Sequence, residues 1–237
     1  MAREPVGRKD GLTSAQAEKG DGRDEVVGES RWPMAGAVIA AMVLTALLPE
    51  EVRKSPSWLL LLVEGLLLVA LVFGDPGRIS RRSRWLRALS IGLVSVLVLS
   101  ALWATIALID DLIEGGPTTN SAGDLLAAGS LVWVSNNLAF ALLYWELDGG
   151  GAAARVHERP RRIDLAFPQE INPRLAPANW QPRFIDYLYL SFTNATAFSP
   201  TDVMPLAPWA KIAMTVQAVI SLAILGLVIA RAVNVFA

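Results

Sequence analysis

The run LRALSIGLVSVLVLSALWATIALI, from Leu86 to Ile109, contains one charged residue, Arg87. A helix needs about 17 to 25 apolar residues to cross a hydrocarbon core of roughly 30 Å, so this run predicts a membrane span. Similar apolar runs cover residues 33–48, 58–73, 125–145 and 208–233, of which the first two are marginal in length. We therefore predict an all-α membrane protein with about five transmembrane helices.

The composition agrees with that prediction and excludes several classes of site. Hydrophobic residues make up 53% of the 237 positions, which is too apolar for an ordinary soluble domain of this size. The chain has no cysteine, so disulfides, thiolate metal sites and a cysteine nucleophile are excluded. Its one histidine, His157, would have to carry any histidine-based catalytic or metal site alone. We expect no enzymatic activity, no metal and no cofactor.

The chain divides into three predicted parts. Residues 1–31 mix charges of both signs with glycine and serine, which is typical of a disordered polar tail. Residues 32–123 form a three-helix membrane part, and residues 124–237 form a second part described below. Tryptophans lie at the predicted ends of the spans, where indole rings prefer the headgroup level: Trp32, Trp58, Trp85, Trp145 and Trp209.

Arginine and lysine in short connections predict the orientation of a membrane protein. Between the second and third runs lie Arg78, Arg81, Arg82, Arg84 and Arg87. The connection after the third run has only acidic charges: Asp110, Asp111, Glu114 and Asp124. We therefore predict a multi-pass protein of the cell membrane with a cytoplasmic N-terminus.

The long connection 146–181 is also rich in arginine, namely Arg155, Arg159, Arg161, Arg162 and Arg174. By the same rule it is cytoplasmic. Its basic surface is interpreted as lying near anionic membrane lipid rather than as binding nucleic acid.

The second part contains a segment of half the usual length. After an outer helix at 125–145 and the connection 146–181, residues 182–193 predict a helix of only about 18 Å. A polar loop follows at 194–205, and an inner helix at 208–233. Backbone without helical hydrogen bonds is tolerated at membrane depth only where protein or water surrounds it. We therefore predict a re-entrant half-helix followed by a loop that is surrounded by protein or by a water-filled cavity.

The segment from Ser191 to Thr196 resembles the end of a pore helix in the potassium-channel-like pore module, and Asp202 to Pro205 resembles the aspartate and proline after its filter. The resemblance implies an oligomer of about four copies that conducts monovalent cations through a central pathway. The residues implied to line that pathway are Thr196, Ala197, Phe198, Ser199, Pro200, Thr201 and Asp202. The segment also resembles an uncharacterised family of bacterial integral membrane proteins, which implies membrane location.

The filter positions depart from the channel pattern. Residues 197–201 read Ala-Phe-Ser-Pro-Thr, so both glycines and the tyrosine of the family's filter are absent. Glycine lets the filter backbone turn its carbonyls toward the ion, so potassium selectivity by a carbonyl ladder is not expected. The departure favours an alternative, a non-conducting scaffold or accessory protein that kept the pore-module fold.

Four polar residues fall inside the predicted spans: Glu64, Asn136, Asn137 and Gln217. An ionisable group such as Glu64 is by default a functional hypothesis, and a small transporter centred on it is a further alternative. The alternative reading is a protonated carboxyl hydrogen-bonded to another helix, with Asn136 and Asn137 as its candidate partners. Asparagines within a span more often hold helices together. Gln217 either faces a pore or holds helices together.

Overall fold

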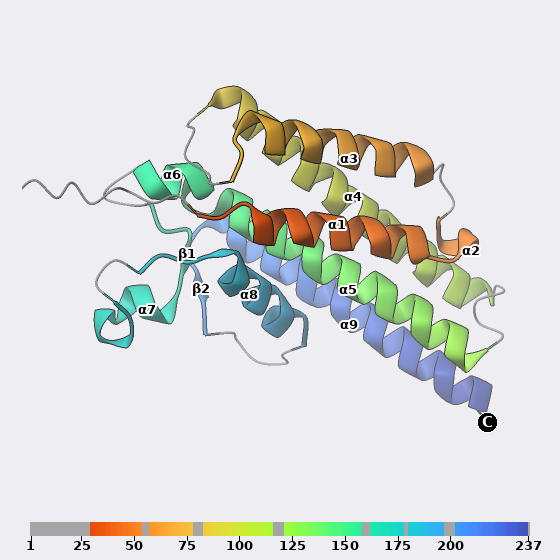
Figure 1. Ribbon diagram of the computed structural model, residues 1–237. Coiled ribbons are helices and arrows are strands. Elements are labelled where there is room, and N and C mark those ends of the chain that lie inside the picture. The colour runs from red at the N-terminus through yellow and green to blue at the C-terminus, as the bar shows by residue number, and fades with distance from the viewer. Residues whose placement is uncertain are drawn as a thin grey trace, which may run out of the picture.

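The computed structural model describes residues 29–53, 57–77, 83–115, 121–157, 162–177, 180–196 and 202–236. Most of the predicted tail, residues 1–28, lies outside these ranges. Five apolar helices of the described chain lie alongside one another (Figure 1). They are α1 (Trp32–Leu47), α3 (Ser57–Gly74), α4 (Arg84–Glu114), α5 (Ala122–Leu147) and α9 (Pro208–Phe236). A short α2 (Glu50–Arg53) follows α1.

Three of these helices, α4, α5 and α9, are long and apolar enough to cross a membrane. The other two are shorter, since α1 has 16 residues and α3 has 18. At about 1.5 Å per residue, α1 is roughly 24 Å long, less than a full hydrocarbon core. The fold is therefore compatible with an integral membrane protein, and the predicted number of about five spans is not confirmed.

Helix α5 lies at the centre of the bundle and packs against α1, α4, α8 and α9. A small residue allows its close approach to α9. A Cβ atom added to Gly129 would lie 2.7 Å from Cγ2 of Val228, so only glycine fits at this crossing. Small residues at helix crossings are typical of membrane bundles, where close backbone approach supplies packing energy.

The connection after α5 is more structured than its aperiodic sequence predicts. It contains η2 (Asp148–Gly150), α6 (Ala152–His157), β1 (Leu165–Ala166), α7 (Pro168–Ile171) and η3 (Pro173–Leu175). Gly149, Gly150 and Gly151 turn the chain at the end of α5 with φ angles of 59°, 83° and 93°. Side chains disfavour such positive φ angles, which explains three glycines in sequence.

Helix α8 (Phe184–Thr196) is the half-length element. It begins two residues after the predicted 182–193 and ends three residues later, because its buried face continues at helical spacing through Tyr187, Ser191 and Ala195. Thr196 therefore belongs to the helix, and its predicted place in the 194–205 loop is wrong.

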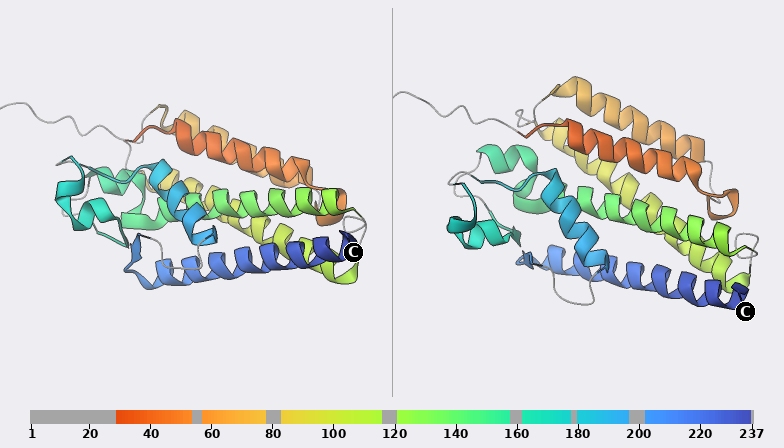
Figure 2. Two further views of the ribbon diagram at one scale, coloured as in Figure 1. Left: turned by 90° about the horizontal axis from the view of Figure 1, so that it is seen from below. Right: turned by 60° about the horizontal axis from the view of Figure 1, so that its bottom comes forward.

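The chain then returns to the end of the bundle where α8 begins. Strand β2 (Met204–Pro205) pairs antiparallel with β1, and α9 starts just after it. Figure 2 shows α8 ending partway along α9. The hairpin therefore opens at the end of the bundle that carries the arginine-rich connection, and the acidic residues between α4 and α5 lie at the other end.

Candidate functional site

A buried hydrogen-bond network holds α8 between α5 and α9. At its centre is Gln217 of α9, which is fully buried. Its Oε1 accepts from the hydroxyl of Tyr144 at 2.7 Å and from Nδ2 of Asn194 at 2.8 Å. Its Nε2 donates to the carbonyl of Ser191 at 3.0 Å and to the hydroxyl of Ser191 at 2.6 Å. Gln217 thus acts as a helix-packing residue within the chain.

The network continues to both neighbouring helices. The hydroxyl of Ser191 donates to the carbonyl of Asn137 on α5 at 2.8 Å. Nδ2 of Asn194 also donates to the carbonyl of Met214 on α9 at 2.9 Å. The rings of Trp133 and Phe192 meet edge to face at 5.8 Å. The half-helix is therefore fixed to α5 and α9 of the same chain by polar and aromatic contacts.

The two asparagines of α5 bond elsewhere than predicted. Nδ2 of Asn136 donates to Oγ1 of Thr105 on α4 at 2.7 Å and to the carbonyl of Val132 at 3.0 Å. Nδ2 of Asn137 donates to the carbonyl of Trp133 at 2.9 Å. Their predicted role as hydrogen-bond partners of Glu64 is therefore wrong. Asn136 instead links α5 to α4.

Glu64 lies on α3, which packs against α1 and α4, and its side chain is fully buried. Neither carboxyl oxygen has a hydrogen-bond partner among the residues that the structure describes. A buried carboxyl group without a partner costs free energy, so Glu64 lowers the stability of the fold. This keeps Glu64 as a candidate functional residue.

We expect Glu64→Leu to raise the free energy of unfolding by about 1 to 3 kcal/mol, because an unsatisfied buried polar group is removed at similar volume. Thermal unfolding of the purified protein in detergent measures this. Glu114→Leu, at an exposed position, serves as the control and should change stability by less than about 0.5 kcal/mol. A clear loss of stability in Glu64→Leu would contradict the prediction.

Two residues of the predicted ion pathway can be placed. Thr196 is the last residue of α8, and its hydroxyl donates to the carbonyl of Phe192 at 2.9 Å. Asp202 is exposed and lies just before β2. The other members, Ala197, Phe198, Ser199, Pro200 and Thr201, lie outside the described residues. Across the described ranges no group of three His, Asp or Glu side chains could hold a metal ion.

Asp148, for which the sequence predicted no role, fastens the long connection to the hairpin. This fully buried carboxylate accepts on Oδ1 from the backbone N–H groups of Asp164 at 3.1 Å and Leu165 at 3.0 Å. Its Oδ2 accepts from the hydroxyl of Tyr187 on α8 at 2.6 Å. In turn, Oδ2 of Asp164 accepts from the N–H of Gly149 at 3.2 Å. The only sequence signal was a carboxylate directly before three glycines.

Arg155 completes this cluster, which we name the Asp148 clasp: Asp148, Arg155, Asp164 and Tyr187. The buried guanidinium of Arg155 donates through Nη1 to the carbonyls of Trp145 at 2.6 Å and Asp148 at 2.8 Å. It also lies 5.1 Å from the ring centre of Tyr187. Nη2 of Arg155 makes no hydrogen bond to the described residues and lies 3.8 Å from Oε2 of Glu29. The carbonyl and aromatic contacts of this side chain hold the end of α5 against α8.

The segment just before α1 is also fixed to this end of the bundle. Oε1 of Glu29 accepts from the N–H of Phe184 at 2.6 Å, and its Oε2 accepts from Nε1 of Trp145 at 2.9 Å. Arg31 is buried and pairs with Asp75, with 3.3 Å between Nη2 and Oδ2. Residues 29–31 thus have defined contacts, although the sequence assigned them to the polar tail.

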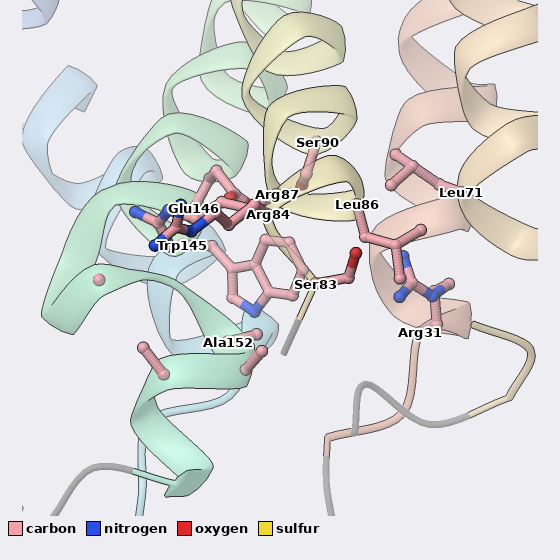
Figure 3. Close-up of a pocket in the computed structure, with 13 residues that line it drawn as sticks. Arg31, Leu71, Ser83, Arg84, Leu86, Arg87, Ser90, Trp145, Glu146 and Ala152 are labelled. Carbon is pink, nitrogen blue, oxygen red and sulfur yellow. Dashed lines mark hydrogen bonds between the residues drawn. The ribbon is translucent and has the colours of Figure 1, made fainter. Parts of the chain in front are cut away.

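A cavity of about 580 Å³ opens at the same end, beside the clasp (Figure 3). Three arginines line it, Arg31, Arg84 and Arg87, together with the carboxylate of Glu146. The hydroxyl of Ser90 donates to Oε2 of Glu146 at 2.5 Å. In Figure 3, Arg31 stands on the α1 side of the cavity, across from Glu146. The cavity is therefore polar and mainly basic where it meets the helix ends.

Comparison with known proteins adds no relative: no family model, no curated protein and no solved structure matches this chain. The resemblance of residues 191–205 to a channel pore module stays a prediction.

Proposed function

We propose that this chain is a channel-like membrane protein in which several copies together form a cation pathway from the segment 196–202. One observation carries the proposal. A helix of half the membrane thickness, α8, is held between two long apolar helices by a buried network centred on Gln217. A fixed half-helix of this kind presents the loop after it at membrane depth, as pore loops require.

The charge of the hairpin supports the same proposal, which also requires several copies of the chain. Asp202 is exposed at the mouth of the hairpin, where a carboxylate concentrates cations. The C-terminal end of α8 also directs the negative end of its dipole toward the loop. One copy of the loop cannot encircle an ion, so the pathway requires about fourfold symmetry around a shared axis.

The exposed apolar residues on α8 and α9 supply surface for contacts with other copies or with lipid. On α8 they are Ile185, Tyr189 and Phe192. On α9, Ile212 and Val219 are likewise exposed. In the proposed assembly part of this surface is covered by neighbouring subunits, and the rest contacts acyl chains.

We expect Asp202→Asn to lower cation flux by roughly threefold to tenfold, because it removes a charge that concentrates cations at the mouth. Flux of potassium and sodium ions into liposomes containing the purified protein measures this. Asp124→Asn, which changes an exposed carboxylate at the other end of the bundle, is the matched control. Equal flux in wild type and Asp202→Asn would exclude Asp202 from the pathway, and no flux in wild type would contradict conduction itself.

A specific observation favours a second function, that of a non-conducting scaffold. All hydrogen-bonding capacity of Gln217 is used inside the subunit, so α9 offers no polar side chain at this level to an ion. The absence of glycine at 197–201 agrees with this alternative. A monomer or dimer in lipid nanodiscs, without cation flux, would favour the scaffold.

The transporter alternative depends on Glu64 alone. Its supporting observation is a buried carboxyl group without a described partner. Proton-coupled flux that is lost in Glu64→Gln would establish it, and flux that survives this change would exclude it.

A further inference from the structure

We propose that the basic cavity binds the phosphate group of an anionic membrane phospholipid. The volume of about 580 Å³ falls within the range of small-molecule sites. Its wall is built at the arginine-rich end of the bundle by parts of α3, α4, α5, η2 and α6, together with the residues just before α1 and α4. None of the described residues that line the cavity belongs to α8 or α9, so the proposal does not depend on conduction.

The positive charges of the cavity are unequally neutralised. Arg31 is paired with the buried carboxylate of Asp75, and Arg87 lies beside Glu146. Arg84 is exposed and makes no hydrogen bond or ion pair to any residue within the described ranges. One arginine therefore remains available to a ligand, and the neighbouring arginines add to the positive potential around it.

The start of α4 adds backbone donors to this charge. Ser83 precedes the helix in an extended conformation, and its side chain makes no capping hydrogen bond. The first N–H groups of a helix have no partner within the helix, and the positive end of its dipole favours anions there. Ser83, Arg84 and Arg87 all line the cavity, so a phosphate group would meet a hydroxyl, backbone donors and guanidinium groups together.

Glu146 places a carboxylate in the cavity, which a binding site for a simple anion such as phosphate would not require. Its carboxylate is buried in the cavity wall and accepts from Ser90. Both this carboxylate and the guanidinium of Arg87 lie close to Gly151. A Cβ atom added to Gly151 would lie 2.7 Å from Nη1 of Arg87 and 3.4 Å from Oε1 of Glu146. A carboxylate beside a phosphate site suits a headgroup that also carries hydroxyl or ammonium donors.

The surroundings favour a lipid over soluble phosphate. Leu71 and Leu86 line the cavity beside the polar groups. Phe73 and Trp85, at the neighbouring ends of α3 and α4, are 82% and 71% exposed. Aromatic rings at helix ends mark the headgroup level of a membrane, so acyl chains would lie along α3 and α4. Basic pockets between helix ends on the cytoplasmic side are suited to anionic headgroups.

The test measures binding of short-chain phosphatidylglycerol to the purified full chain in neutral detergent, by native mass spectrometry and by the shift in thermal unfolding. Phosphatidylcholine of the same chain length and inorganic phosphate are the comparison ligands. We expect phosphatidylglycerol to bind most tightly, and Arg84→Gln to weaken its affinity about tenfold, the effect of losing one charge-assisted hydrogen bond. Arg174→Gln, an exposed arginine outside the cavity, should leave the affinity unchanged.

Arg84→Lys keeps the charge and should retain affinity within about threefold. Equal binding of the two lipids, or equal losses in Arg84→Gln and Arg174→Gln, would overturn the proposal. Stabilisation by inorganic phosphate alone, without binding of phosphatidylglycerol, would assign the site to a soluble anion and overturn the proposal that its ligand is a phospholipid. If Arg84→Gln unfolds without ligand at a lower temperature than wild type, Arg87→Gln replaces it in the binding test. Weaker binding of phosphatidylglycerol to Arg87→Gln would then support the proposal, and unchanged binding would overturn it.

Discussion

Gln217→Met should lower the free energy of unfolding by about 2 to 4 kcal/mol. Methionine keeps nearly the same volume, so the loss isolates hydrogen bonding from packing. The substitution leaves the hydroxyl of Tyr144 and Nδ2 of Asn194 without their shared acceptor in a buried site. It also removes both donors to Ser191. Each unsatisfied buried group costs about 1 to 3 kcal/mol, although membrane bundles recover part of that cost.

Unfolding of the purified protein by heat or by denaturing detergent measures the effect. Thr215→Val is the matched control, because Thr215 is exposed two residues earlier on α9 and its hydroxyl donates only to its own helix at Lys211. The control should stay within about 0.5 kcal/mol of wild type. Equal stabilities of Gln217→Met and Thr215→Val would contradict the network.

Asp148→Ala should lower the free energy of unfolding by about 3 kcal/mol, since it removes a buried charged acceptor of two backbone N–H groups and one hydroxyl. The loss should act on the contact between the long connection and α8 first, because Tyr187 bridges the two.

Hydrogen exchange at the amide groups of Asp164 and Leu165 reports this local opening, and thermal unfolding reports the total loss. Asp124→Ala, at the exposed first turn of α5, is the control and should cost about 0.5 kcal/mol through the helix dipole. If Asp148→Ala protects both amides as well as wild type does, the clasp has no role in holding this connection.

The apolar runs predicted the helical bundle because a membrane helix needs a long run of apolar residues, and such runs can be counted in the sequence. They also predicted α1 and α3 to within one residue at each end, since the runs 33–48 and 58–73 correspond to Trp32–Leu47 and Ser57–Gly74. With 16 and 18 residues, both helices are short for a full membrane span. Leu48, the residue after α1, already has an extended backbone before Pro49. The number of spans therefore remained open for these two helices.

The sequence predicted that a half-length helix exists, but it predicted the residues where that helix begins and ends less well. Tyr187, Ser191 and Ala195 continue one buried face past the predicted end at residue 193. The polar residues Asn194 and Thr196 suggested a loop, since hydrogen bonds to a neighbouring helix cannot be read from sequence alone. Asn194 bonds to Gln217, a residue 23 positions away.

The polar contacts across the bundle were the least predictable feature. Two asparagines and a glutamate at similar depths suggested mutual hydrogen bonds, yet Asn136 bonds to Thr105 and Glu64 has no described partner. Depth in the membrane fixes only one coordinate of a side chain. The rotation of each helix about its axis, set by packing, decides which polar groups meet.

The hairpin opens at the arginine-rich end of the bundle, and we propose that this end faces the cytoplasm. The chain has no native cysteine, so single cysteines can be labelled without background. A membrane-impermeant maleimide applied to intact cells should label Glu114→Cys, whereas Arg174→Cys and Asp202→Cys should react only after permeabilisation. Labelling of both Asp202→Cys and Glu114→Cys from outside would contradict a hairpin that opens toward the cytoplasm.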